Sequence, residues 1–137
     1  MTTDCYGKLH VGNKSQGRIA TFLLKIGENT IGRAAPEHQS QIEIQNDEYL
    51  SRVHFTIEVS SDAFGRIHYT LFDNHSHNGT SFYCKKTKTK KQLQPLERIN
   101  IVKGDQIKAG DTYFEIEPLH LQVESKNIGV TKIDVWV

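Results

Sequence analysis

Residues 53–72 read VHFTIEVSSDAFGRIHYTLF, in which two alternating runs of apolar and polar residues flank a polar segment. The runs VHFTIEV (53–59) and IHYTLF (67–72) are rich in β-branched and aromatic residues, and alternation with period two is typical of half-buried strands. Between them, the segment from Ser60 to Gly65 is typical of a turn. The stretch therefore predicts two strands joined by a turn.

The same pattern continues in both directions along the chain. No window of a dozen residues keeps a helical period with caps at both ends. Turn residues gather at 13–17, 34–40, 74–79, 104–105 and 110–111. Many short strands at this spacing favour an all-β fold, either an antiparallel sandwich or a barrel. The further runs that predict strands are TFLLKI (21–26), QIEIQ (41–45), SFYC (81–84), RINIV (98–102) and TYFEIE (112–117).

Length and composition indicate one globular domain. The chain has 137 residues, of which 36% are hydrophobic and 24% charged, with a net charge of +1. This charge provides no overall field to attract nucleic acid or an anionic membrane. Cys5 and Cys84 are too few for a disulfide scaffold. The start MTTDCYGK does not resemble a signal peptide, and no apolar stretch approaches the roughly 18 residues of a membrane helix. We therefore expect a cytoplasmic protein with no membrane partner.

Three polar motifs carry the functional signal: TIGR (30–33), SRVH (51–54) and HNGT (77–80). If the fold brings them together, they offer guanidinium, hydroxyl, imidazole and carboxamide groups in one place. Such a set suits a phosphate, because arginine matches its oxygens bidentately and neutral donors fill the remaining lone pairs.

The order GR, SRxH, NGT resembles the signature of forkhead-associated (FHA) domains, which read phosphothreonine peptides. The resemblance covers residues 7–118 and implies an antiparallel β-sandwich of the SMAD/FHA type, with about ten to twelve short strands. Residues 119–137 lie beyond it as a C-terminal extension expected to add one or two strands. Such a strand could pack on the domain's own edge, which we favour, or be laid against another molecule.

The resemblance also assigns roles to the residues that contact the ligand. It implies that Arg33, Ser51 and Arg52 hold the phosphate, and that Asn78 holds the peptide main chain. Position 77 departs from the family, in which Ser or Thr is usual. His77 is therefore predicted as an additional phosphate contact that could retune the site.

Three further residues are expected to support the loops. Gly32 is predicted to allow a tight exit from a strand, and Gly79 to supply a left-handed turn. By resemblance, His54 is structural and holds the loop that presents Ser51. Alternation puts His54 on the face opposite Phe55, as a partly buried imidazole.

The predicted function is a phosphopeptide-binding module in signalling, favoured as a monomer, whose partner is a phosphothreonine-containing protein. The alternative is a phosphate-independent interaction module that acts through a sheet face or its C-terminal strand. Nucleic-acid binding through the lysine-rich run CKKTKTKKQ (84–92) is disfavoured, because no aromatic residue interleaves with these lysines. Catalytic motifs are missing, and His75 and His77 lack a ligand set around them, so we expect no enzyme, cofactor or metal.

Overall fold

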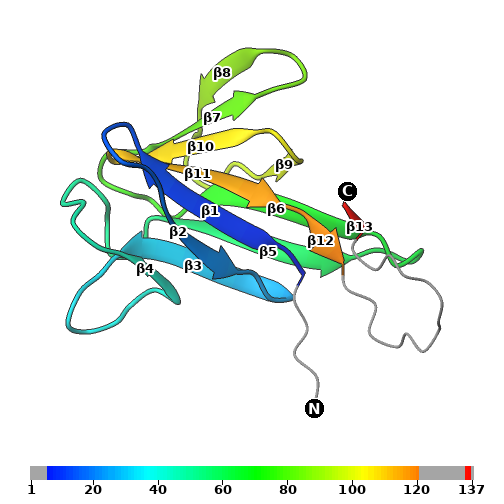
Figure 1. Cartoon of the computed structure of the whole chain (residues 1–137), viewed down its shortest axis with the longest axis horizontal. Coiled ribbons are helices and arrows are strands. Elements are labelled where there is room, and N and C mark those ends of the chain that lie inside the picture. The colour runs from blue at the N-terminus through cyan, green and yellow to red at the C-terminus, as the bar shows by residue number, and fades with distance from the viewer. Residues whose placement is uncertain (1–5, 121–134, 137) are drawn as a thin grey trace.

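The computed structural model describes residues 6–120 and 135–136, and this part of the chain contains strands and no helix. No helix in it is long and apolar enough to cross a membrane. Two sheets form the body of the molecule (Figure 1). The six-stranded sheet has the order β2 (Gly17–Leu23), β1 (Lys8–Asn13), β11 (Thr112–Glu117), β10 (Gln106–Ala109), β7 (Thr80–Cys84), β8 (Thr89–Gln92). The five-stranded sheet has the order β4 (Ile42–Ile44), β3 (Gly27–Arg33), β5 (Phe55–Ser61), β6 (Ile67–Asp73), β9 (Ile99–Ile101).

The two sheets bury their facing sides in one core. Leu9 and Phe114 come from the six-stranded sheet, and Ile57 and Leu71 from the five-stranded sheet, and all four are at most 1% exposed. The rings of Phe55 and Phe114 meet edge to face across the core, with centroids 4.9 Å apart. The alternation seen in the sequence is therefore the alternation of buried and exposed faces, and the predicted β-sandwich is confirmed.

Several predicted strand boundaries are wrong. The run 21–26 is not one strand, because β2 ends at Leu23 and β3 begins at Gly27. The side chain of Asn29 bonds both the N–H and the carbonyl of Lys25, and this closes a turn between the two strands. β5 begins at Phe55 rather than at Val53.

One strand pair departs from the predicted antiparallel arrangement. β3 and β4 are parallel, with Ile31 opposite Ile42. The side chains of Thr30 and Gln41 each bond the backbone N–H of the other residue, so the start of β4 is held beside β3 after the intervening loop. The connection, residues 34–41, is longer than the two-residue loop of an antiparallel hairpin.

The C-terminal extension contributes β12 (Leu119–His120) and β13 (Val135–Trp136), which pair antiparallel with each other. In the described part of the chain they form a sheet of their own and join neither larger sheet. The expectation that the extension packs on an edge of the domain stays a prediction. Residues 121–134, Val137 and Cys5 lie outside the described residues, and the 7–118 domain boundary stays a prediction.

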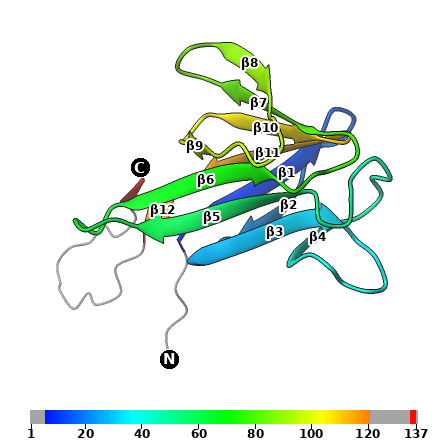
Figure 2. The ribbon, with the colours of Figure 1, turned by 180° about the vertical axis from the view of Figure 1, so that it is seen from behind.

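The loops divide between two ends of the sandwich. At one end, the apical end, lie the loop between β4 and β5, the β6–β7 turn and the β10–β11 turn, together with the end of β3 (Figure 2). The β5–β6 hairpin lies at the opposite end. All three sequence motifs therefore map to the apical end.

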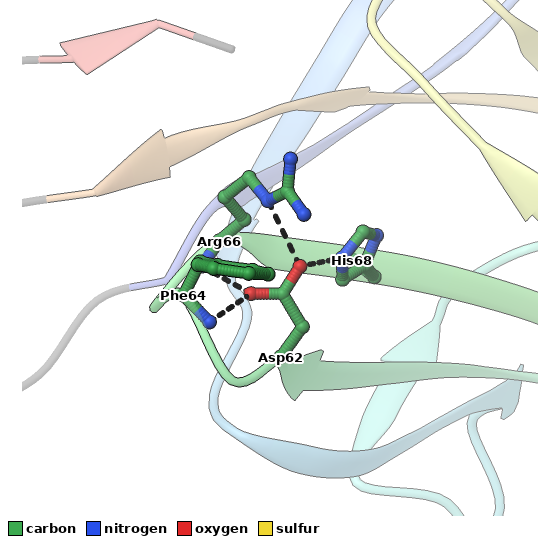
Figure 3. A network of polar contacts seen from close by, with 4 residues as sticks. All are labelled: Asp62, Phe64, Arg66 and His68. Atoms are coloured by element: carbon green, nitrogen blue, oxygen red, sulfur yellow. Dashed lines mark hydrogen bonds and ion pairs between the residues drawn. The ribbon is translucent and has the colours of Figure 1, made fainter.

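The β5–β6 hairpin is closed by one carboxylate, that of Asp62 (Figure 3). It accepts hydrogen bonds from the N–H groups of Phe64 (2.8 Å) and Arg66 (2.9 Å) and from the ring of His68 (2.8 Å). The His68 bond, followed by the Arg66 N–H, holds the pKa of Asp62 well below its usual range. This end of the molecule is organised by local contacts and is independent of the apical loops.

Candidate functional site

The apical loops meet through hydrogen bonds between the three motifs. The N–H of Arg33 donates to the carbonyl of Ser51 (2.9 Å), and the N–H of His77 donates to the hydroxyl of Ser51 (2.9 Å). The amide of Asn78 donates to the carbonyl of Tyr49 (2.9 Å). The expectation that the fold gathers these segments is therefore confirmed.

Arg33, the last residue of β3, has a fixed side chain. It is half-buried, and its Nε donates to the carbonyl of Leu50 at 3.1 Å. This bond orients the plane of the guanidinium, while its two terminal nitrogens have no partner among the described residues. Two parallel donors remain, in the geometry that suits two oxygens of an anion.

Ser51 and its neighbours add further donors. Because the Ser51 hydroxyl accepts the His77 N–H, its own proton is left to donate outward. The side chains of Arg52 and His77 are exposed, and within the described residues neither has a partner. The structure thus places Ser51 and the backbone of residue 77 in direct contact, with Arg52 adjacent in the chain.

His54 bridges two of the loops from beneath. Its ring is fully buried, not partly buried as the sequence predicts. The N–H of Ser51 donates to Nδ1 (2.9 Å), so Nδ1 carries no proton, and Nε2 donates to the carbonyl of Gly79 (2.8 Å). Burial lowers the pKa of His54, although the Gly79 carbonyl and the charges of Asp73 and Asp47 act in the opposite direction. A neutral imidazole therefore links SRVH to HNGT, in agreement with the supporting role expected for it.

Gly79 and Gly32 are required for different structural reasons. Gly79 has a φ of +82°, which confirms the predicted left-handed turn. Gly32 lies inside β3, so the predicted role in a strand exit is wrong. A Cβ at Gly32 would lie 1.9 Å from the carbonyl oxygen of Arg52. Gly32 is needed because the backbone of the SRVH segment passes directly over it.

Asp73, which the sequence analysis did not single out, shapes the β6–β7 turn. Its buried carboxylate accepts bonds from the N–H of Ser76 (2.9 Å) and from the hydroxyls of Ser76 (2.5 Å) and Thr80 (2.6 Å). Burial alone raises the pKa of Asp73, but these hydrogen bonds outweigh it and leave the pKa below its ordinary value. The signal available in the sequence was an Asp at the start of a turn-rich segment, because Asp side chains commonly bond nearby backbone N–H groups.

Asp47 is a second buried carboxylate that the sequence analysis missed. It accepts bonds from the N–H groups of Tyr49 (3.0 Å) and Asp111 (2.8 Å) and from the hydroxyl of Thr112 (2.5 Å). It thereby ties the loop that carries Tyr49 to the β10–β11 turn. Asp47 and Asp111 are 64 residues apart in the chain, so no local sequence pattern predicts this hydrogen bond.

A hollow of about 890 Å³ lies between the β1–β2 turn, β4 and the β10–β11 turn, beside the apical loops. Within the described residues, no three His, Cys, Asp or Glu side chains gather as metal ligands. Converging donors, two permanent positive charges and open access allow these loops to bind an anionic group carried by a larger molecule.

Comparisons with known proteins agree with this arrangement. The FHA domain family matches residues 29–110. The structure of full-length yeast Pml1p is similar, with a TM-score of 0.65, 18% identity, and coverage of 81% of this chain and 80% of that one. A structure from a study of phosphothreonine-dependent FHA domain interactions has a TM-score of 0.57, 24% identity, and coverage of 83% and 95%. The FhaA FHA domain, solved with the intracellular domain of Rv3910, has a TM-score of 0.57, 24% identity, and coverage of 80% and 98%. A search of curated proteins found no match.

Proposed function

Because the chain belongs to the FHA domain family, whose members are phosphopeptide-binding modules, we propose that its apical loops recognise phosphothreonine-containing segments of partner proteins in signalling. FHA domains are binding modules rather than enzymes. The observation that carries the proposal is that two fixed donor groups lie on directly bonded segments. The Arg33 guanidinium is oriented by the Leu50 carbonyl and the Ser51 hydroxyl by the His77 N–H, and the N–H of Arg33 donates to the carbonyl of Ser51.

In this proposal the phosphate lies against Arg33, Ser51 and Arg52. A phosphothreonine carries about −1.5 to −2 charges near neutral pH, with three acceptor oxygens. The terminal nitrogens of Arg33 take two of these oxygens, and the Ser51 proton is donated to a third. Arg52 adds a second positive charge. Neighbouring loops already hold Arg33 and Ser51, so their binding geometry requires little ordering when the ligand arrives.

Asn78 holds the peptide backbone beside the phosphate. One of its amide hydrogens is used on the Tyr49 carbonyl, which fixes the orientation of the side chain. The remaining hydrogen and the carbonyl oxygen can bond one peptide unit of the ligand. The exposed side chain of Tyr49 lies next to this contact, with 56% of its surface accessible.

Binding is expected to require the phosphate and to prefer phosphothreonine over phosphoserine. The FHA resemblance implies a small pocket for the threonine methyl, and burying a methyl group contributes about 1 kcal/mol, or several-fold in affinity. Titration calorimetry with matched peptides carrying Thr, phosphothreonine and phosphoserine measures both effects. Equal affinity for the unmodified peptide would support the phosphate-independent interaction module instead.

His77 is expected to add a hydrogen bond to the phosphate. Its backbone N–H donates to the Ser51 hydroxyl, and its exposed imidazole can donate a further bond. His77→Ala should therefore weaken binding of the phosphothreonine peptide by about 0.5–1.5 kcal/mol, as measured by titration calorimetry. An affinity equal to that of the wild type would make His77 a turn residue only.

A further inference from the structure

Two adjoining hollows lead away from Asn78 across the outer face of the six-stranded sheet. The first has a volume of about 360 Å³ and is lined by Asn78, Ser81 and Lys108, among others. The second has a volume of about 250 Å³ and is lined by Tyr83 and Lys90, and again by Ser81 and Lys108. The hollows share Ser81 and Lys108, so they adjoin, and the first of them begins at Asn78, at the apical end of the domain.

The strand register determines what lines this path. Lys90 of β8 stands opposite Tyr83 of β7, which stands opposite Gln106 of β10. One row towards the apical end, Lys108 lies between Ser81 and Tyr113, with its ammonium 5.8 Å from the centre of the Tyr113 ring. We name this surface the basic lane, which consists of Ser81, Tyr83, Lys90, Gln106, Lys108 and Tyr113.

Lys90 makes the lane suitable for an anion. Its neighbour Lys91, on the opposite face of β8, is paired with Glu97, whereas Lys90 has no carboxylate partner among the described residues. Two carboxylates border the path: Asp111 lines the first hollow together with Asn78, and Glu115 stands opposite Gln106 on the side away from β8. The positive charges of the lane are therefore Lys90 on β8 and Lys108 on β10.

We propose that the basic lane holds an acidic stretch of the same partner segment that carries the phosphothreonine, with Asp, Glu or a second phosphorylated residue over Lys90. This inference rests on the proposed function. β7 begins at Thr80, two residues after Asn78, and Tyr83 lies three strand residues further on, about 10 Å. An extended peptide has a similar rise, so the acidic residues lie several positions from the phosphothreonine.

Continuity with Asn78 favours a peptide over a nucleic acid as the occupant. A strand of phosphates placed along the lane would also meet Asp111 and Glu115 at its border, at a cost in repulsion. A peptide can place acidic side chains towards Lys90 and neutral ones towards the carboxylates. The two tyrosines offer apolar surface for its backbone and aliphatic groups.

The test compares a short phosphothreonine peptide with the same peptide extended by acidic residues, on either side, and with a matched glutamine extension. One acidic extension is expected to raise affinity roughly three- to tenfold at low salt, with a smaller gain at higher salt. Lys90→Gln and Tyr83→Ala should remove most of this gain and leave the short peptide unaffected. Lys91→Gln, one residue away on the opposite face, is the matched control and should keep the gain.

The outcomes separate this inference from the proposed function. The basic lane does not bind the acidic residues if the short phosphopeptide binds but acidic extensions do not raise its affinity, or if Lys90→Gln keeps the whole gain in affinity. Either result leaves the proposed phosphate site intact. If the short phosphopeptide does not bind at all, the proposed function fails and the inference fails with it. A single-stranded oligonucleotide that binds more tightly than the extended peptide, and depends on Lys90 and Tyr83, would identify nucleic acid as the occupant and overturn the proposal.

Discussion

Arg33→Ala is expected to weaken binding of a phosphothreonine peptide roughly 10- to 150-fold while the domain stays folded. Loss of a hydrogen bond to a charged group costs about 1.5–3 kcal/mol, and arginine supplies two such bonds from a fixed plane. The backbone of Arg33 keeps its bond to Ser51, so β3 is not disturbed. Calorimetric titration gives the affinity, and thermal unfolding monitors the fold.

Two comparisons make this result specific to the site. Arg33→Lys keeps the charge but loses the Nε bond to Leu50 and the paired donors, so it should recover only part of the affinity. Arg66→Ala removes the same charge from the β5–β6 hairpin at the opposite end and should leave affinity unchanged (Figure 3). Ser51→Ala should have a smaller effect than Arg33→Ala, because a hydroxyl carries no charge. Unchanged affinity in a folded Arg33→Ala protein would show that the phosphate binds elsewhere.

His54→Ala should produce the largest loss of stability. The change leaves a buried cavity and deprives the Ser51 N–H and the Gly79 carbonyl of their partner. The expected cost is about 2–5 kcal/mol of unfolding free energy, or roughly 10–20 °C in melting temperature. The loops it joins carry the phosphate contacts, so affinity should fall as well. A melting temperature equal to that of the wild type would mean that His54 is not the bridge described above.

The same residue should make stability depend on pH. Burial lowers the pKa of His54 in the folded state below its ordinary value of 6.5. The unfolded chain therefore takes up the proton first, so His54 contributes its full stability above about pH 6.5 and this contribution is lost as pH falls towards the folded pKa. When the pH is lowered from 7.5 to 5.5, the melting temperature of the wild type should fall further than that of His54→Gln, because the glutamine side chain does not titrate. Parallel curves would contradict the prediction, since the other histidines are common to both proteins.

Some elements could be predicted because their information is local. The runs that became β6 and β11 alternate over six or seven residues, and in these two strands the alternation reports one buried face. β5 was also recognised from its alternation, although Phe55, Thr56 and Ile57 are all buried in it. By contrast, all four residues of TKKQ in β8 are exposed and give it no apolar face, so its sequence resembles a solvated loop. The β2–β3 turn was missed because it depends on the side chain of Asn29, which sits inside a strand and reaches back to Lys25.

The chemical set of the site was also visible in the sequence. The motifs TIGR, SRVH and HNGT contain the donors, and Gly79 indicates the left-handed turn that follows Asn78. These features depend on residue type and on neighbours in the chain, so they can be recognised without the fold. Which groups remain available to a ligand was decided by tertiary contacts, since the Ser51 hydroxyl and one hydrogen of the Asn78 amide are already used by other loops.

The sequence by itself determined an all-β fold and three donor-bearing loops, because alternation and turn chemistry act over a few residues. The choice of a sandwich over a barrel came from the FHA resemblance. Only the tertiary structure decided how these loops are braced and what surrounds them. Asp47 reaches the β10–β11 turn across 64 residues. In the sequence, the lysines of 84–92 have no aromatic residue among them, yet the sheet places Tyr83 beside Lys90, and Tyr113 of a distant strand beside Lys108. Strand order sets such neighbours, and it follows from how the whole core is buried rather than from any local stretch.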